Sequence, residues 1–166
     1  MYETDLTSPR IGFAREHARK AFKACSHCCP MGFPDSLDSI IPYVIPGYTL
    51  ISLDRLQKIS AITIKQKMLI GFNSSHAQVR VRFSIAHEIG HICLCHPDTV
   101  FSSQIAHGVY ETEANSFAAE FLVPLSTLKT VFRSIRDPRE LAKHFNVSRE
   151  VIFLRLKESR LLSSIL

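Results

Sequence analysis

Hydrophobic and polar positions repeat with a helical period in two stretches near the middle of the chain. Apolar residues between Phe83 and Leu94 fall on nearly every side of a helix, which predicts a buried helix. Residues 110–123 place apolar side chains at positions i, i+3, i+4, i+7 and i+8, which predicts an amphipathic helix that Pro124 ends. This second stripe consists of Ala114, Phe117, Ala118, Phe121 and Leu122.

Short runs of β-branched and apolar residues precede these helices at 48–53, 61–64 and 68–72. The polar residues 65–67 between the last two runs indicate a turn, so we expect a small antiparallel sheet. Peptide ligands often bind to an exposed sheet edge as an added strand. Residues 68–72 or 78–81 are therefore the candidate wall of a binding cleft.

Helices are also expected towards both ends of the chain. Residues 10–24 predict a helix, and an irregular region rich in cysteine and proline follows it as far as residue 46. Near the other end, Asp137 is an expected N-cap followed by Pro138, and Ser148 begins a second helix after a short turn. This predicts a helix-turn-helix-like C-terminal segment. We expect an α+β protein divided into 1–46, 47–125 and 126–166, packed as one domain overall.

Charge is concentrated in the C-terminal segment. Between Lys129 and Arg160 there are nine Lys or Arg against four Asp or Glu, a net charge of +5 that equals the net charge of the whole chain. Such a patch can bind phosphates or attract an acidic face of a protein. Because the segment has no evident row of base-reading side chains, docking of a protein substrate or a scaffold role is favoured over direct nucleic-acid binding.

Composition places the chain among ordinary globular domains. Of its 166 residues, 46% are hydrophobic and 21% are charged. The first thirty residues hold no apolar run long enough for a secretory signal or a membrane span. We therefore expect a cytoplasmic protein with no membrane partner. The sequence assigns no oligomeric state.

The five cysteines do not suggest a disulfide framework, because an odd number cannot all pair within one chain. Cys25 and Cys28 have the spacing of a zinc or redox site, with Cys29 or His27 as a further ligand. No matching second pair follows. Reduced thiols are therefore the expected state.

The buried helix carries the run His87-Glu88-Ile89-Gly90-His91, which has the pattern H-E-x-x-H. Positions i and i+4 lie on the same face of a helix, so both imidazoles can reach one zinc ion. Zinc lowers the pKa of bound water from ~15.7 towards ~7, and a carboxylate at Glu88 can take the proton and pass it to a leaving amine. The pattern thus predicts hydrolysis of an amide bond.

A hydrolytic zinc site needs a third protein ligand and one open position. The pattern with a third histidine fails, because Leu94 and Pro97 stand where its glycine and histidine would be. In the amphipathic helix, Glu111 continues the predicted buried stripe, whereas Glu113 aligns with the polar face. Glu111 is therefore the preferred ligand and Glu113 the alternative.

Other residues have candidate supporting roles in such a site. Asn115 lies four residues after Glu111 and is expected to hydrogen-bond a ligand histidine. Zinc is the expected ion, although Mn²⁺ or Fe²⁺ also accept two imidazoles and a carboxylate. Four residues are candidates for stabilising an oxyanion, without spacing evidence: Tyr48, His76, His107 and Tyr110.

Three segments of the chain together resemble the ImmA/IrrE family of bacterial metallopeptidases. They are residues 82–91, then Glu111-x-Glu113-Ala114-Asn115-x-Phe117-Ala118-Ala119, and then Leu122-Val123-Pro124. The resemblance covers about residues 48–162. It implies a zincin-like core with an active-site helix, and a cytoplasmic endopeptidase that cleaves a helix-turn-helix repressor and so derepresses mobile-element or stress genes. Carried over by position, it implies His87, His91 and Glu111 as ligands and Glu88 as general base.

Two other functions remain open from the residues. One is a DNA-binding regulator in which the metal site is only structural. The other is a metal hydrolase that acts on a small amide or a nucleotide, because H-E-x-x-H by itself does not specify a substrate. The activating signal and the scissile bond leave no sequence trace.

Overall fold

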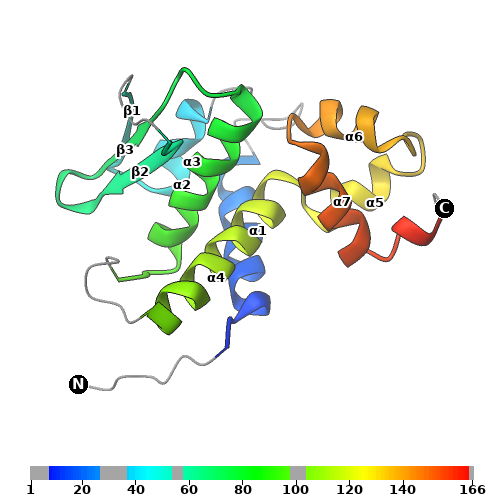
Figure 1. Ribbon diagram of the computed structural model, residues 1–166, viewed down its shortest axis with the longest axis horizontal. Coiled ribbons are helices and arrows are strands. Elements are labelled where there is room, and N and C mark those ends of the chain that lie inside the picture. Colours follow the sequence, from blue (N-terminus) through cyan, green and yellow to red (C-terminus); the bar gives the residue numbers. More distant parts are fainter. Residues whose placement is uncertain (1–7, 27–36, 54–57, 98–103, 165–166) are drawn as a thin grey trace.

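The computed structural model describes residues 8–26, 37–53, 58–97 and 104–164, and it shows an α+β fold as expected (Figure 1). Its elements, in chain order, are α1 (Ile11–Cys25), η2 (Asp38–Ile40), α2 (Ile41–Val44), β1 (Thr49–Ser52), β2 (Ala61–Ile64), η3 (Lys65–Lys67), β3 (Leu69–Phe72), α3 (Gln78–Cys93), α4 (Gln104–Leu122), α5 (Leu125–Val131), α6 (Pro138–Phe145), α7 (Arg149–Glu158) and η5 (Leu162–Ser164). The sheet lies at one end of the molecule and α5–α7 at the other, with α3 and α4 between them.

The three strands lie where the sequence places them, and the expected antiparallel pairing holds for β2 and β3, but β1 is parallel to β3, so the sheet is mixed. The strand order is β1-β3-β2, with β1 parallel and β2 antiparallel to β3. The η3 turn joins β2 and β3 as a hairpin, and β3 then inserts beside β1. Alternating side chains have the same period in parallel and antiparallel strands, so the sequence pattern does not reveal this order.

Neither segment predicted to form a cleft wall has a free strand edge. Strand β3, within the predicted segment 68–72, is paired on both sides. Residues 78–81 are the first turn of α3, whose start is stabilised when Val81 N donates to Ala77 O at 3.0 Å. The outer strand that packs against α3 is instead β2.

Helices α3 and α4 form the centre of the molecule, and α1 packs along α4 (Figure 1). The predicted stripe on α4 is confirmed, since each of its five residues is at most 1% exposed. The helix begins at Gln104, earlier than expected, and ends before Pro124, which is the N-cap of α5. No described helix is long and apolar enough to cross a membrane.

The C-terminal segment folds as predicted from its capping residues. The Asp137 side chain accepts from Arg139 N at 2.8 Å at the start of α6, and Ser148 Oγ accepts from Val151 N at 3.4 Å at the start of α7. Between the two helices, Asn146 adopts a left-handed conformation with φ of 48°.

A buried arginine connects this segment to the core. Arg155 of α7 is fully buried, donates from Nε to Val123 O at 3.0 Å, and forms ion pairs with Glu120 of α4 and Glu158 of α7. From α1, Arg15 pairs with Glu158 and Arg19 with Glu120. Helices α1, α4 and α7 are therefore joined by one network of charges.

Candidate metal centre

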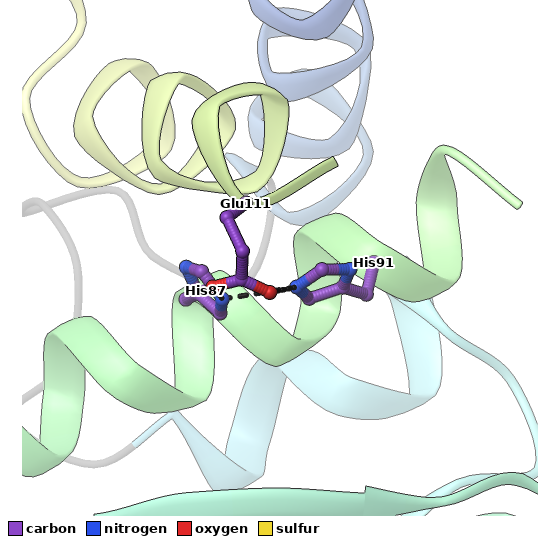
Figure 2. Close-up of side chains that lie close together, drawn as sticks. All are labelled: His87, His91 and Glu111. Carbon is purple, nitrogen blue, oxygen red and sulfur yellow. Dashed lines mark hydrogen bonds and ion pairs between the residues drawn. The ribbon is translucent and has the colours of Figure 1, made fainter. Parts of the chain in front are cut away.

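Helices α3 and α4 bring together His87, His91 and Glu111 (Figure 2). The Nε2 atoms of the two histidines are 2.9 Å apart. Glu111 approaches from α4, with Oε2 3.3 Å from His87 Nε2 and Oε1 3.2 Å from His91 Nε2. One face of the H-E-x-x-H helix and a carboxylate from a separate helix thus converge on one point.

The size of this cluster fits a transition-metal ion. Zinc binds nitrogen and carboxylate oxygen at ~2.0–2.2 Å in a tetrahedral arrangement, which puts neighbouring ligand atoms ~3.3 Å apart. The separations of 2.9, 3.3 and 3.2 Å are close to this value. Across residues 8–26, 37–53, 58–97 and 104–164, no other group of three His, Cys, Asp or Glu side chains is close enough to share an ion.

Each histidine makes a further contact on the side of its ring away from the cluster. His87 Nδ1 lies 2.9 Å from Asn115 Oδ1, so the expected contact between Asn115 and a ligand histidine is present. His91 Nδ1 lies 2.9 Å from His96 Nδ1, a residue that the sequence analysis did not select. Burial and the neighbouring imidazoles lower the pKa of His91 to about 3, so its ring is neutral.

Glu113, the alternative ligand, lies outside this cluster. Its carboxylate is fully buried and bonds to Arg10 of the N-terminal region and to His96. The prediction that Glu113 lies on the polar, solvent-facing side of α4 was wrong, because its side chain is fully buried. Glu111 is itself 38% exposed at the side chain, so it does not continue the buried stripe.

Glu88 lies beside the cluster and is held by the sheet. Thr63 of β2 donates from Oγ1 to Glu88 Oε2 at 2.6 Å. Burial raises the pKa of Glu88, and the hydrogen bond from Thr63 partly opposes this rise. A carboxylate in this position can exchange a proton with a group bound at the neighbouring cluster.

Two adjoining cavities lead away from Glu88. The first, of about 310 Å³, is lined by Ser60, Ala61, Arg80, Phe83, Ser84, His87, Glu88 and Asn115. The second, of about 490 Å³, is lined by Val79, Arg80, Phe83, Ser84, Ser148 and Val151. Three lining residues are shared, so the two cavities form one groove from the cluster to the start of α7.

The four oxyanion candidates lie in different surroundings, and none of them lines this groove. His76 Nδ1 is 2.8 Å from the hydroxyl of Ser60, which lines the groove. His107 lies one turn before Glu111, with Nδ1 3.8 Å from Glu111 Oε1. The Tyr110 ring packs on His96 at 4.7 Å, and Tyr48 packs against the core.

The cysteines of the described regions are thiols. Cys25 is buried and donates to Phe22 O, Cys93 is partly buried, and Cys95 is exposed. Burial raises the pKa of the Cys93 thiol to about 12. His27, Cys28 and Cys29, which complete the predicted second site, lie outside the described residues.

Comparison with known proteins supports the arrangement just described. The model of the Peptidase_M78 family, described as the IrrE N-terminal-like domain, matches residues 51–157. The chain belongs to this family. The matched range of this IrrE-like peptidase domain includes α3, α4 and nearly all of α7, and it confirms the family resemblance seen in the sequence.

Among solved structures, the IrrE-like chain is similar to a Mycobacterium tuberculosis transcriptional regulator. The TM-score is 0.66 at 16% sequence identity, and the match covers 88% of this chain and 51% of that one. At this identity the similarity concerns the fold alone, and the chain spans about half the length of that protein. No curated protein matches the chain significantly.

Proposed function

We propose that this protein is a zinc-dependent endopeptidase whose substrate is a helix-turn-helix transcriptional repressor. The observation that carries the proposal is the convergence of His87, His91 and Glu111 beside Glu88, in a chain of a metallopeptidase family. Two imidazoles and one carboxylate are the protein ligands of several zinc peptidases. Mn²⁺ or Fe²⁺ is the alternative ion for this donor set.

When bound to these three ligands, the ion would supply Lewis acidity, which polarises a carbonyl and makes water acidic near neutral pH. The side chains of the protein transfer the proton and orient the reacting groups. Glu88 holds a proton at Oε1 or Oε2 and returns it to the leaving amine, and Thr63 fixes the direction of its carboxylate. Asn115 orients the His87 ring so that Nε2 faces Glu111.

The substrate would lie in an extended conformation along β2. This strand is at the edge of the described sheet, and Ser60 and Ala61 at its start line the groove together with Glu88. A peptide that adds to a sheet edge gains backbone hydrogen bonds whatever its sequence. Specificity would then come from the second cavity, where Val79, Phe83 and Val151 form an apolar surface beside Arg80.

The C-terminal segment favours a protein partner over DNA. Arg155 is one of its nine basic residues, but it is buried in ion pairs and is not available to a ligand. Helix α7, in the position of a recognition helix, exposes Phe153 and Leu154 at 47% each, and its exposed charges are mixed: Arg149, Glu150 and Lys157. Exposed apolar side chains suit a protein interface better than a phosphate backbone.

We place this activity in the cytoplasm, where such a repressor is found and where Cys93 and Cys95 remain reduced. Its expected consequence is derepression of mobile-element or stress genes.

The test incubates the purified zinc-loaded protein with helix-turn-helix repressors, beginning with any encoded beside its gene. We expect one discrete cleavage that a chelator abolishes. Glu88→Gln should retain zinc and lose cleavage by a factor of ~10²–10⁴. Repressors that stay intact under every metal tested contradict the proposal. Salt-sensitive duplex binding that is indifferent to Glu88→Gln would support the regulator with a structural metal site instead.

A further inference from the structure

A chain of hydrogen bonds runs from His91 away from the metal cluster into the core. His91 Nδ1 is 2.9 Å from His96 Nδ1, and His96 Nε2 is 3.0 Å from Glu113 Oε2. The His96 residue is 2% exposed and Glu113 is fully buried. Buried polar groups are costly unless they are paired, so this arrangement constrains all three side chains.

Arg10, which immediately precedes α1, donates the last hydrogen bonds in this series. Its backbone N donates to Glu113 Oε1 at 2.7 Å, its Nε donates to the same oxygen at 2.9 Å, and its Nη2 donates to Oε2 at 2.9 Å. A backbone N–H and a guanidinium can only donate, and these three donors occupy both oxygens of Glu113. Glu113 therefore acts only as an acceptor.

Because Glu113 can only accept, it determines which nitrogen of His96 and of His91 carries the proton. His96 must donate to Glu113 from Nε2, and a neutral imidazole carries one N–H, so Nδ1 of His96 is an acceptor. His91 must then donate from Nδ1. Its Nε2 is left with a lone pair directed towards Glu111 and His87.

The backbone is shaped to hold His96 in this place. After α3, Cys95 adopts the left-handed conformation with φ of 54°, and His96 N donates to His91 O at 3.0 Å. Lys65 donates to His96 O, and the ring of Tyr110 packs on the imidazole at 4.7 Å. His96 is thus fixed by α3, by the hairpin turn and by α4.

The two ligand histidines therefore differ in their support. His87 donates to a neutral amide oxygen on the surface of α4, whereas His91 is connected through an imidazole to a buried carboxylate. A carboxylate behind a ligand histidine orients the ring and increases its basicity.

We propose that His96 and Glu113, held by Arg10, are positioning residues that set the tautomer and the orientation of His91 as a metal ligand. This inference rests on the proposed metal centre. It also means that the residue preceding α1, far from the cluster in sequence, contributes to metal affinity.

The test measures the zinc affinity of the whole protein by competition with a chromophoric chelator. Glu113→Gln and His96→Ala should each weaken zinc binding by ~10–100-fold, the usual cost of losing such support. His96→Asn should recover part of the loss, because its amide oxygen can accept from His91 Nδ1. Arg10→Gln, which keeps the backbone donor, is a milder variant for the case that Glu113→Gln does not fold, and it should weaken binding to a smaller extent.

The matched control is Glu120→Gln. Glu120 lies on the same helix, is similarly buried and is also ion-paired, but its partners are Arg155 and Arg19, and none of them contacts a metal ligand as His96 does. It should lower stability and leave zinc affinity and the absorption spectrum of the Co²⁺-substituted protein unchanged. The inference is overturned if Glu113→Gln binds zinc as tightly as the wild type, or if Glu120→Gln loses as much affinity. A wild-type protein that binds no zinc would instead refute the proposed metal centre.

Discussion

Gly90 of α3 lies directly against Phe117 of α4. A Cβ atom at position 90 would be 3.2 Å from Cβ, Cγ and Cδ1 of Phe117, closer than ordinary van der Waals contact. Gly90 immediately precedes His91, and Phe117 lies on the helix that carries Glu111. The absence of a side chain at position 90 therefore sets the distance between the two helices that supply the metal ligands.

Gly90→Ala should move α3 away from α4 and enlarge the ligand cluster. Overpacking of this kind costs about 1–3 kcal/mol, partly offset by the better helix propensity of alanine. We expect lower zinc affinity, measured by chelator competition, together with a lower Tm. Gly12→Ala on α1, where a Cβ would meet nothing within 4 Å, is the control and should leave zinc affinity unchanged without lowering the Tm. Unaltered zinc binding by Gly90→Ala would show that the helix spacing does not set the site.

Thr63→Val should slow cleavage without weakening substrate binding. Valine keeps the shape of the strand residue but removes the hydroxyl that donates to Glu88 at 2.6 Å. A hydrogen bond to a charged group contributes about 1.5–3 kcal/mol, so kcat should fall by roughly 10- to 100-fold. Steady-state kinetics on a cleaved repressor measure this, and zinc content serves as the control. A rise in KM at constant kcat would assign Thr63 to substrate binding instead.

Arg155→Met should destabilise the whole protein. The substitution leaves the buried Glu120 with its ion pair to Arg19, and removing one member of a buried ion pair costs about 3–5 kcal/mol. Urea unfolding followed by circular dichroism measures the loss. Lys157→Met, at an exposed position of the same helix, should change stability by less than about 0.5 kcal/mol. Equal effects of the two substitutions would contradict a structural role for Arg155.

The contribution of Glu113 to stability should depend on pH. Its pKa is lowered from the ordinary 4.5 to about 2, because its hydrogen bonds outweigh burial. A group with a lowered pKa in the folded state stabilises fully above its unfolded pKa, and this stabilisation is lost as the pH falls towards the folded value. The Tm difference between wild type and Glu113→Gln, both with chelator, should therefore be largest at neutral pH and shrink towards about pH 3. A difference that is constant across this range would argue against an ionised Glu113.

The sequence leads to Glu111 for a reason that the structure does not support. Helical phase favours Glu111 as part of a buried stripe, yet its side chain is 38% exposed while Glu113 is fully buried. Helix α4 is covered by α3 on one side and by α1 on another, so it has two buried faces. The second face can bury the carboxylates of Glu113 and Glu120 because arginines from the N-terminal region form ion pairs with them. Arg10 is 103 residues from Glu113, a distance at which local periodicity carries no information.

Local signals predicted the elements better than their assembly. Capping residues correctly placed α6 and α7, and apolar periodicity placed α3 and α4, because these signals act within a few residues. The order of the strands and the position of His96 depend on long-range contacts. His96 follows α3 by three residues and has no motif spacing, and a left-handed Cys95 brings it back beneath the helix.

The burial of Arg155 has a practical consequence for studying the C-terminal segment. Deleting residues 126–166 would remove the guanidinium that pairs with Glu120 and caps the Val123 carbonyl inside the core. A truncated protein would therefore lose activity through unfolding of α4, whatever the segment binds. Charge reversal at exposed positions such as Lys143 and Arg149 leaves the buried contacts of Arg155 intact. It therefore tests whether the segment binds a partner without unfolding the protein.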